Sequence, residues 1–144
     1  MDIALRQDFD PDVDFYYEAQ FEVYHEPYLL WNRQIWEAVA AACDVYRIEA
    51  EGEYAGDIIL ENRGKGTAYI VDFSILPDYQ RRGVGTEVLN RIENRSPRLL
   101  AVTRKETLPF FLKSGFVLKR RIRDYYDRRV DGYYIECKVR LQKR

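Results

Sequence analysis

Short apolar runs alternate with polar turns along the whole chain, and their spacing predicts an ordered series of strands and helices. Runs bounded by turn signals predict strands over residues 3–6, 45–49, 54–60, 68–76, 99–103, 116–126 and 133–141. Start signals, stop signals and helical spacing predict helices over residues 13–24, from 32 to about 43, from 84 to the stop at Ser96-Pro97, and over 108–113. The resulting order, β-α-α-β-β-β-α-β-α-β-β, is typical of a mixed α/β domain with one sheet of about seven strands and about four helices.

Two of the predicted helices begin at recognisable capping residues. Asp10 followed by Pro11 predicts a start with aspartate as the N-cap and proline at the first helical position. Asn32 predicts the N-cap of the second helix. Trp31 before this cap and Trp36 after it have the spacing of a hydrophobic staple.

The composition fits one soluble domain over residues 1–144. Apolar residues make up 47% and charged residues 33% of the chain, which suits a globular protein with a real core. The longest apolar run has six residues, too few to cross a membrane, and the acidic N-terminal stretch is unlike a secretion signal, so we expect a cytoplasmic protein. Two cysteines and one histidine do not provide a disulfide framework or a metal site.

Charge is distributed unevenly along the chain. Residues 1–62 hold 15 acidic and 3 basic side chains, whereas residues 63–144 hold 9 acidic and 20 basic ones. The basic part could meet an anionic, phosphate-bearing ligand and the acidic part a cation, or the two parts could simply pack together. Nucleic acid is not the expected partner, because the net charge is only −1 and the N-terminal third is strongly acidic.

A loop rich in glycine and arginine carries the strongest chemical signal. The strand predicted to end at Leu76 is followed by a segment with Arg81, Arg82, Gly83 and Gly85, and a helix begins at once. Backbone N–H groups of such a turn and of the first helical turn form a cradle for an anion. The segment matches neither the Walker loop nor the GxGxxG fingerprint, and by itself it is also compatible with a plain strand–turn–helix corner.

The residues around this loop resemble a known family. Gln80-Arg81-Arg82-Gly83-Val84-Gly85 fits the Q/R-x-x-G-x-G/A signature of motif A in the GNAT acyltransferases. The stretch from Phe110 to Phe116 resembles motif B, FYxxxGF, and Gly56 matches a further common position. The predicted element order is similar to the family's order over nearly the whole chain. More loosely, the segment 123–126 resembles the tail of protein N-terminal acetyltransferases such as the ribosomal-protein alanine enzymes.

The resemblance implies a binding site for acetyl-CoA as co-substrate. The pyrophosphate would lie on the backbone of residues 80–86, and the pantetheine arm would lie along residues 73–75, where two neighbouring strands must separate. The short helix that contains Phe111 would flank the thioester. The implied cofactor-binding residues are Phe73, Ser74, Ile75, Gln80, Arg81, Arg82, Gly83, Val84, Gly85, Thr86 and Phe111.

The implied reaction is direct attack of a primary amine on the thioester in a ternary complex. It needs a base, a donor to the oxyanion and a proton for the thiolate. Phe111 replaces the usual motif B tyrosine and cannot donate a proton. Asp72 is the candidate base, and Tyr125 and Tyr126 are candidate proton donors. The alternatives stay open that Asp72 is only a hydrogen-bonded strand carboxylate and that the two tyrosines only pack.

The acceptor is expected to be a small-molecule or peptide amine. Acidic and aromatic residues crowd the stretch 14–31, which suits a cationic acceptor and equally suits a solvated helix face. An alternative function is an acyl-CoA-binding or regulatory module with weak or no transfer activity, which Phe111 favours. A homodimer formed through exposed aromatic residues stays open.

Overall fold

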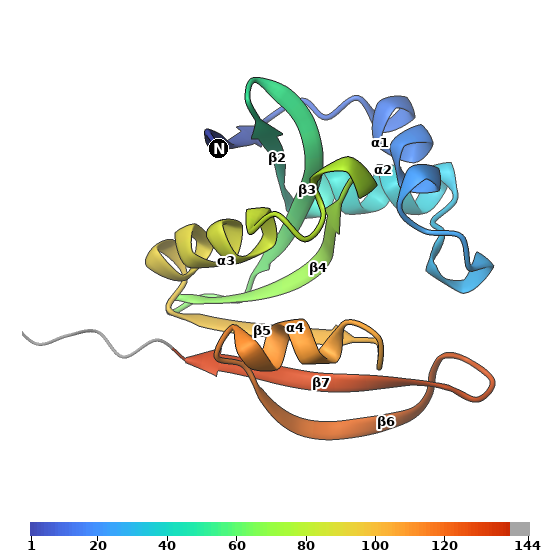
Figure 1. Cartoon of the computed structure of the whole chain (residues 1–144). Helices are drawn as coiled ribbons and strands as arrows, with labels where there is room; N and C mark the ends of the chain where they lie inside the picture. Colours follow the sequence, from blue (N-terminus) through green and yellow to red (C-terminus); the bar gives the residue numbers. More distant parts are fainter. Residues whose placement is uncertain (139–144) are drawn as a thin grey trace, which may run out of the picture.

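A computed structural model describes residues 1–138, which form one seven-stranded sheet flanked by helices (Figure 1). In chain order the elements are β1 (Ile3–Asp8), α1 (Val13–Ala19), α2 (Arg33–Ala42), β2 (Asp44–Ala50), β3 (Glu53–Asn62), β4 (Thr67–Ile75), α3 (Val84–Arg95), β5 (Arg98–Thr103), α4 (Leu108–Lys113), β6 (Val117–Asp127) and β7 (Val130–Lys138). Short 3-10 turns η1 (Gln20–Glu22), η2 (Pro27–Leu29) and η3 (Pro77–Tyr79) connect some of them. The predicted order is confirmed, although the predicted end of the last strand lies outside the described residues.

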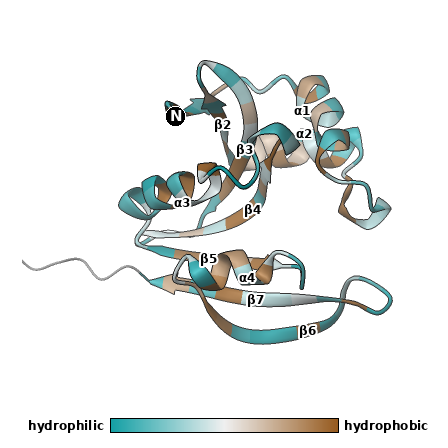
Figure 2. Cartoon of the chain, in the orientation of Figure 1, coloured by the Kyte–Doolittle hydropathy of each residue, from teal (hydrophilic) through white to brown (hydrophobic). Residues whose placement is uncertain are grey.

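The sheet has the strand order β1-β2-β3-β4-β5-β7-β6. Every neighbouring pair is antiparallel except β4 and β5, which run parallel. Helices α3 and α4 cover one face, where buried Val88 and Ile92 of α3 share a core with strand residues such as Ile58 and Ile135. On the other face α1 and α2 cover a smaller aromatic core. Figure 2 shows apolar colours along the central strands and polar colours along much of the edge strand β6.

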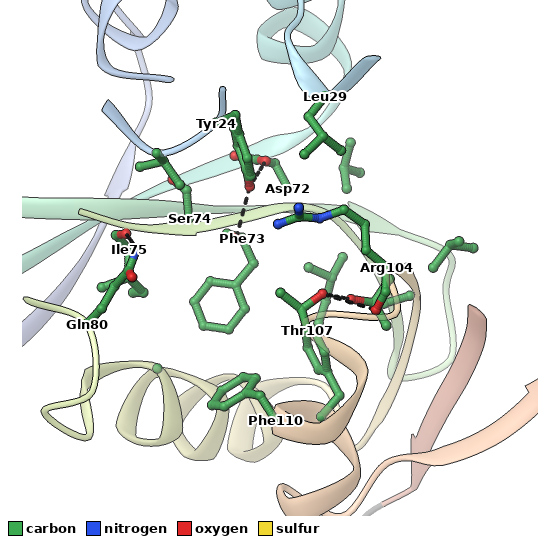
Figure 3. A pocket seen from close by; sticks show the side chains of 18 of the residues that line it. Tyr24, Leu29, Asp72, Phe73, Ser74, Ile75, Gln80, Arg104, Thr107 and Phe110 are labelled. Carbon is green, nitrogen blue, oxygen red and sulfur yellow. Dashed lines mark hydrogen bonds between the residues drawn. The ribbon is translucent and has the colours of Figure 1, made fainter. Parts of the chain in front are cut away.

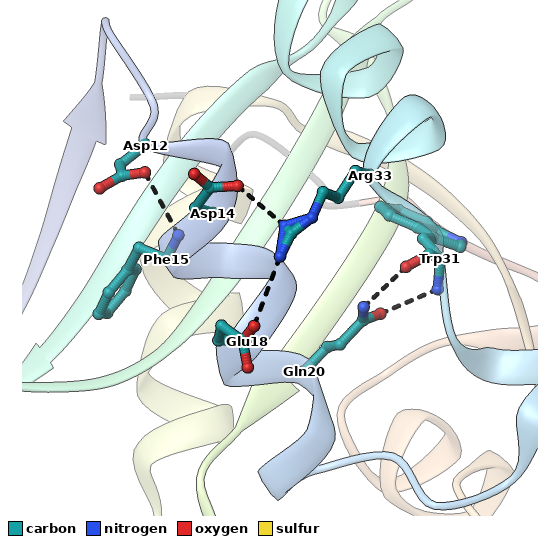
Figure 4. Close-up of polar contacts among 7 residues, drawn as sticks. All are labelled: Asp12, Asp14, Phe15, Glu18, Gln20, Trp31 and Arg33. Carbon is teal, nitrogen blue, oxygen red and sulfur yellow. Dashed lines mark hydrogen bonds and ion pairs between the residues drawn. The ribbon is translucent and has the colours of Figure 1, made fainter.

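The start of α1 differs from the prediction. Asp12, not Asp10, is the N-cap, and its side chain accepts a hydrogen bond from the Phe15 N–H at 3.3 Å (Figure 4). Pro11 therefore lies before the cap instead of inside the helix. An N-cap side chain commonly bonds the backbone N–H of the residue three positions later. Asp12 has this spacing to Phe15, and so Asp12, not Asp10, is the cap.

The first helix is also shorter than predicted, because it ends at Ala19 and not near Tyr24. Gln20 follows in a 3-10 turn and its side chain turns inward. Its amide donates to the Trp31 carbonyl at 2.7 Å and accepts from the Trp31 N–H at 2.9 Å (Figure 4). This pair of bonds ties together the two ends of the segment 20–31.

The start of α2 is confirmed. The Asn32 side chain accepts a hydrogen bond from the Ile35 N–H at 2.9 Å. The rings of Trp31 and Trp36 meet edge to face with their centroids 4.8 Å apart, as a staple across the cap requires. No helix within residues 1–138 has the length and apolarity needed to cross a membrane.

Candidate active site

Strands β4 and β5 separate partway along their length. They pair only from Thr67 opposite Arg98 to Ile70 opposite Ala101. The register of β4 with β3 shifts at the same place, so Val71 is an extra, bulged residue. The remainder of β4 stays paired with β3, and among residues 1–138 it has no strand partner on its β5 side.

A cleft of about 950 Å³ occupies this separation. Its walls come from β4, the loop before α3, the first turn of α3, the end of β5, α4, and the segment 23–31 that joins η1 to α2. Figure 3 shows side chains from these elements converging around the free end of β4. Separation of the two strands, expected from the family resemblance, is therefore confirmed.

The free edge of β4 has its carbonyl groups engaged by side chains. The Gln80 amide donates to the Ile75 carbonyl at 2.8 Å, and the Tyr24 hydroxyl lies 3.2 Å from the Phe73 carbonyl (Figure 3). The N–H and C=O groups of one residue in an extended strand point toward the same side of the strand, and so toward the same neighbouring strand. The N–H groups of Phe73 and Ile75 therefore face the open edge, where they can donate to carbonyl oxygens of a ligand.

The glycine-rich loop closes one end of the cleft with backbone donors. Gly83 has a φ of +82° and caps α3 without a side-chain hydrogen bond, so the first N–H groups of the helix have no cap from a side chain. Added side-chain atoms at Gly83 would meet open space, and Gly83, Val84, Gly85 and Thr86 all line the cleft. This end of the cleft is suited to an anion.

The two arginines of the loop differ in position. Arg81, which takes a φ of +59°, lines the cleft together with Gln80. Arg82 does not line it; its guanidinium donates to the Asp78 carbonyl at 3.0 Å and lies over the Tyr79 ring. These local contacts place the Arg82 side chain outside the cleft, and its part in the cofactor site stays a prediction.

A cluster of polar side chains lies beneath the free end of β4. The Tyr24 hydroxyl donates to Asp72 Oδ1 at 3.0 Å, and the Ser74 hydroxyl donates to Asp57 Oδ2 at 3.1 Å. Asp57 comes from β3, is only 4% exposed, and shares its face of the sheet with Asp72. Within the described residues the remaining oxygens, Asp57 Oδ1 and Asp72 Oδ2, are buried and lack a donor.

One proton between the two carboxyl groups satisfies both of these oxygens. Burial first, and then the charge of Asp72, raise the pKa of Asp57 well above its usual range, although the Ser74 hydrogen bond lowers it. Two neighbouring carboxylates cannot both stay charged away from water. Asp57 is therefore the group that keeps its proton, and its Oδ1–H can donate to Asp72 Oδ2, which is otherwise unpartnered within residues 1–138.

A second consequence concerns Tyr24. Burial and the charge of Asp72 raise the pKa of Tyr24, while the positive charge of Arg104 lowers it. The hydroxyl stays protonated near neutral pH and holds Asp72 Oδ1 in place. Because a carboxylate oxygen accepts two hydrogen bonds, Oδ1 keeps the capacity to meet an amine.

Tyr125 and Tyr126 both reach the cleft because β6 is irregular there. The β6–β7 register shifts between Ile122 and Asp127, and Asp124 takes a φ of +54°. In a regular strand adjacent side chains point to opposite faces. The Tyr126 hydroxyl donates to the Val102 carbonyl at 3.0 Å, and burial is the main cause that raises the pKa of Tyr126.

Phe111 lines the cleft but belongs mainly to the core. It is buried, and its ring centroid lies 5.2 Å from those of Phe110 and Phe116 and 6.3 Å from that of Phe73. No proton donor exists at this position. The start of α4 after Thr107, with Pro109 in the first turn, agrees with the prediction.

Most of the acidic residues near the N-terminus lie away from the cleft. Asp14 and Glu18 both approach Arg33 of α2, at 3.0 and 3.6 Å (Figure 4). Of the acidic residues in the stretch 14–31, only Glu26 lines the cleft. Two of the four acidic residues in this stretch therefore help to join the first two helices, and the expectation of a cationic acceptor stays a prediction.

All but one of the predicted site residues line this single cleft. Those that do are Asp72, Phe73, Ser74, Ile75, Gln80, Arg81, Gly83, Val84, Gly85, Thr86, Phe111, Tyr125 and Tyr126. Sequence reasoning missed Asp57, and it placed Tyr24 only in the aromatic stretch expected to meet the acceptor, without its contact to Asp72. Asp57 carried one usable signal, since a charged residue directly before the apolar run Ile58–Leu60 is unusual in a buried strand.

Comparison with known proteins gives one family. Residues 7–116 match the model of the acetyltransferase (GNAT) family, which is more than half of the chain. No curated protein is similar enough in sequence to count as a relative.

Several solved structures share the fold. The ribosomal-protein-S18-alanine N-acetyltransferase from Escherichia coli superposes with a TM-score of 0.78 at 18% identity, covering 99% of this chain and 97% of that chain. A Bacillus subtilis acetyltransferase in complex with CoA gives 0.75 at 15% identity, with 96% and 100% covered. A GNAT acetyltransferase from Elizabethkingia anophelis with acetyl-CoA bound gives 0.70 at 14% identity, with 95% and 98% covered. At such identities the likeness concerns the fold.

Proposed function

The chain belongs to the acetyltransferase (GNAT) family, and we propose that it transfers an acetyl group from acetyl-CoA to a primary amine. One observation carries this proposal. The separation of β4 from β5 opens a cleft that combines a glycine-rich helix start, a free strand edge and a carboxylate. The helix start suits the phosphates of CoA, the free strand edge suits its amide-containing arm, and the carboxylate suits the acceptor amine.

The proposed cofactor site follows the length of the cleft. The backbone N–H groups of residues 83–86 bind the pyrophosphate, and Arg81 adds a positive charge. The pantetheine arm runs along residues 73–75 as an added strand. Two solved structures of the same fold have acetyl-CoA or CoA bound, which supports this assignment.

In the proposed reaction the amine nitrogen attacks the thioester carbonyl carbon. The acceptor arrives as an ammonium and first loses one proton, which passes to solvent. A C–N bond then forms and the C–S bond breaks, while the nitrogen loses a second proton and the sulfur takes one up, giving an amide, free CoA and one released proton. Asp72 receives the second proton directly or through water. The Phe73 N–H faces the position of the oxyanion, and such a donor is worth several kcal/mol in other enzymes, about 3 to 4.

Tyr126 is the proposed proton donor to the sulfur. The hydroxyl is protonated at neutral pH, as a donor must be, and burial raises its pKa, which makes it a weaker acid. The hydroxyl donates to the Val102 carbonyl at present, so it must exchange this acceptor during the reaction. The contribution is modest, because a thiol with a pKa of about 8.5 is already a good leaving group. Tyr125 lies beside it with its ring edge to face, 4.9 Å away, and supports its position.

Calorimetric titration with acetyl-CoA, with free CoA as the comparison, tests the cofactor site. We expect micromolar binding of both, and a Gly83→Ala variant should bind at least about tenfold more weakly, because its methyl group occupies the anion cradle. Gly64→Ala is the matched control. Both glycines have a φ near +80° and no atom within 4 Å of an added Cβ, so both variants carry similar backbone strain. Equal binding by the two variants would refute the assignment.

A second candidate function is acyl-CoA binding without efficient transfer. The buried Phe111, which leaves this position of α4 without a proton donor, is the observation that favours it. Both functions predict CoA binding, so turnover separates them. Release of free thiol on addition of an amine supports the transferase, and its absence across an amine screen supports the binding module.

A further inference from the structure

Arg104 brings a positive charge into the acceptor side of the cleft. It follows the last residue of β5 directly, lines the cleft, and its side chain is only 20% exposed. Within residues 1–138 its guanidinium donates no hydrogen bond, and its one carboxylate neighbour is Glu26 at 4.0 Å. A guanidinium has five N–H donors, so most of its hydrogen-bonding capacity is available to a ligand.

Asp72 faces Arg104 across the same space. Figure 3 shows the guanidinium pointing along the separation of the strands toward Asp72 and Tyr24. Both charges act on the hydroxyl groups of Tyr24 and Tyr126, with opposite effects on the pKa of each tyrosine, so both lie within electrostatic range of these groups. No ion pair joins Asp72 to Arg104 in the described part of the chain. An anion and a cation thus point into one cavity without neutralising each other.

Resting on the proposed acetyl transfer, we infer that the acceptor is a free α-amino acid, whose amine meets Asp72 and whose carboxylate meets Arg104. The amine and the carboxylate of such a molecule are separated by one carbon atom, so it carries both charges that the cleft complements. A planar guanidinium binds a carboxylate through two parallel hydrogen bonds. The transfer is the one described above, and the products are an N-acetyl amino acid and CoA.

The surroundings favour a small acceptor over a peptide. The rings of Tyr28 and Tyr126 lie 6.4 Å apart and bring the segment 23–31 and β6 together at this side of the cleft. A peptide chain would have to pass between these elements. In addition, the first residue of a peptide has its carboxyl group in an amide bond, so it offers no anion to Arg104 beside its amine.

The test compares each amino acid with its own amide, which keeps the amine and the side chain but lacks the carboxylate. Thiol release from acetyl-CoA is followed with the twenty standard amino acids, their amides, short peptides and a polyamine. We expect at least one amino acid to be acetylated, with a kcat/KM about 10- to 100-fold above that of its amide, as expected for loss of hydrogen bonds to a charged group. The inference would be overturned if the amides, the peptides or the polyamine gave a kcat/KM equal to or above that of every amino acid.

The Arg104→Gln variant assigns the effect to this side chain. We expect it to raise the KM for the amino acid about 10-fold or more, to leave the amide unchanged, and to keep the acetyl-CoA affinity of the parent protein. Arg128→Gln, at an exposed turn outside the cleft, is the matched control and should change none of these values. An Arg104→Gln variant that lowers turnover of amino acid and amide alike would contradict the inference.

Failure of the inference and failure of the proposed function give different results. If acetyl-CoA binds and other amines react while no amino acid does, only the acceptor assignment is wrong. If acetyl-CoA binds and no amine reacts, transfer itself is wrong and the acceptor assignment fails with it. If neither acetyl-CoA nor CoA binds, the cofactor site is wrong as well.

Discussion

Replacement of Asp57 by asparagine tests the shared proton beneath β4. An asparagine side chain can still donate to Asp72 and accept from Ser74, so the variant keeps both contacts of the protonated acid and removes only its ability to ionise. Burial and the charge of Asp72 raise the pKa of Asp57 in the folded protein. In the unfolded chain an aspartate has a pKa of about 3.9.

The size and sign of the effect follow from this difference. Above about pH 4 the unfolded chain releases the proton while the folded protein keeps it, so folding becomes less favourable as the pH rises toward the pKa of the folded state. A difference of one bound proton between the folded and unfolded states changes the free energy of unfolding by about 1.4 kcal/mol per pH unit. The Asp57→Asn variant does not lose stability in this way, because asparagine does not ionise. Its stability relative to the parent protein should rise by up to about 4 kcal/mol between pH 5 and pH 8.

Urea unfolding followed by tryptophan fluorescence measures this quantity. Trp31 and Trp36 both lie in the core beside α2 and report on the folded state. Titratable groups that do not contact position 57 are common to both proteins and cancel in the difference, and Asp72 keeps a hydrogen-bond donor at position 57 in both. Asp10→Asn, at an exposed position, is the control for the chemical change and should show no pH trend. A difference between Asp57→Asn and the parent protein that stays constant within about 0.5 kcal/mol over this range would refute the shared proton.

Two further predictions concern the geometry of the cleft. A Cβ at Gly56 would lie 2.0 Å from the Ser74 carbonyl oxygen, so Gly56→Ala should lose about 3 kcal/mol or more of stability. Gly52→Ala, with open space around the added Cβ, should lose about 1 kcal/mol. Equal losses in urea unfolding would contradict the argument. Tyr126→Phe should lower kcat about tenfold without changing the KM for acetyl-CoA, and an unchanged kcat in steady-state thiol release would exclude Tyr126 as the donor.

The order of elements could be predicted from the sequence because it depends on local signals. Apolar periodicity and turn residues set seven strands and four helices in the observed order, and the Asn32 cap and its tryptophan staple are confirmed. The glycine-rich loop was also recognisable, since positive φ angles and free N–H groups at a helix start need a particular short sequence. That residues 1–144 form one domain stays a prediction.

The errors arose where a local signal had a competitor. Asp10 and Asp12 are equally good capping residues in the sequence, and the position of the first free N–H decides between them. Two further expectations stay predictions. The Arg82 side chain contacts a carbonyl and a tyrosine ring outside the cleft. Two acidic residues of the stretch 14–31 contact Arg33, while Glu26 lines the cleft.

The sequence by itself determined the elements, the family signature and the loop for an anion. Only the tertiary structure decided which charged groups meet. Asp57 and Asp72 are 15 positions apart and share a proton because β3 and β4 pair with a particular register. Asp72 and Arg104 face each other because β4 and β5 separate after Ile70. Such encounters depend on strand pairing between distant segments, and no local pattern of residues specifies them.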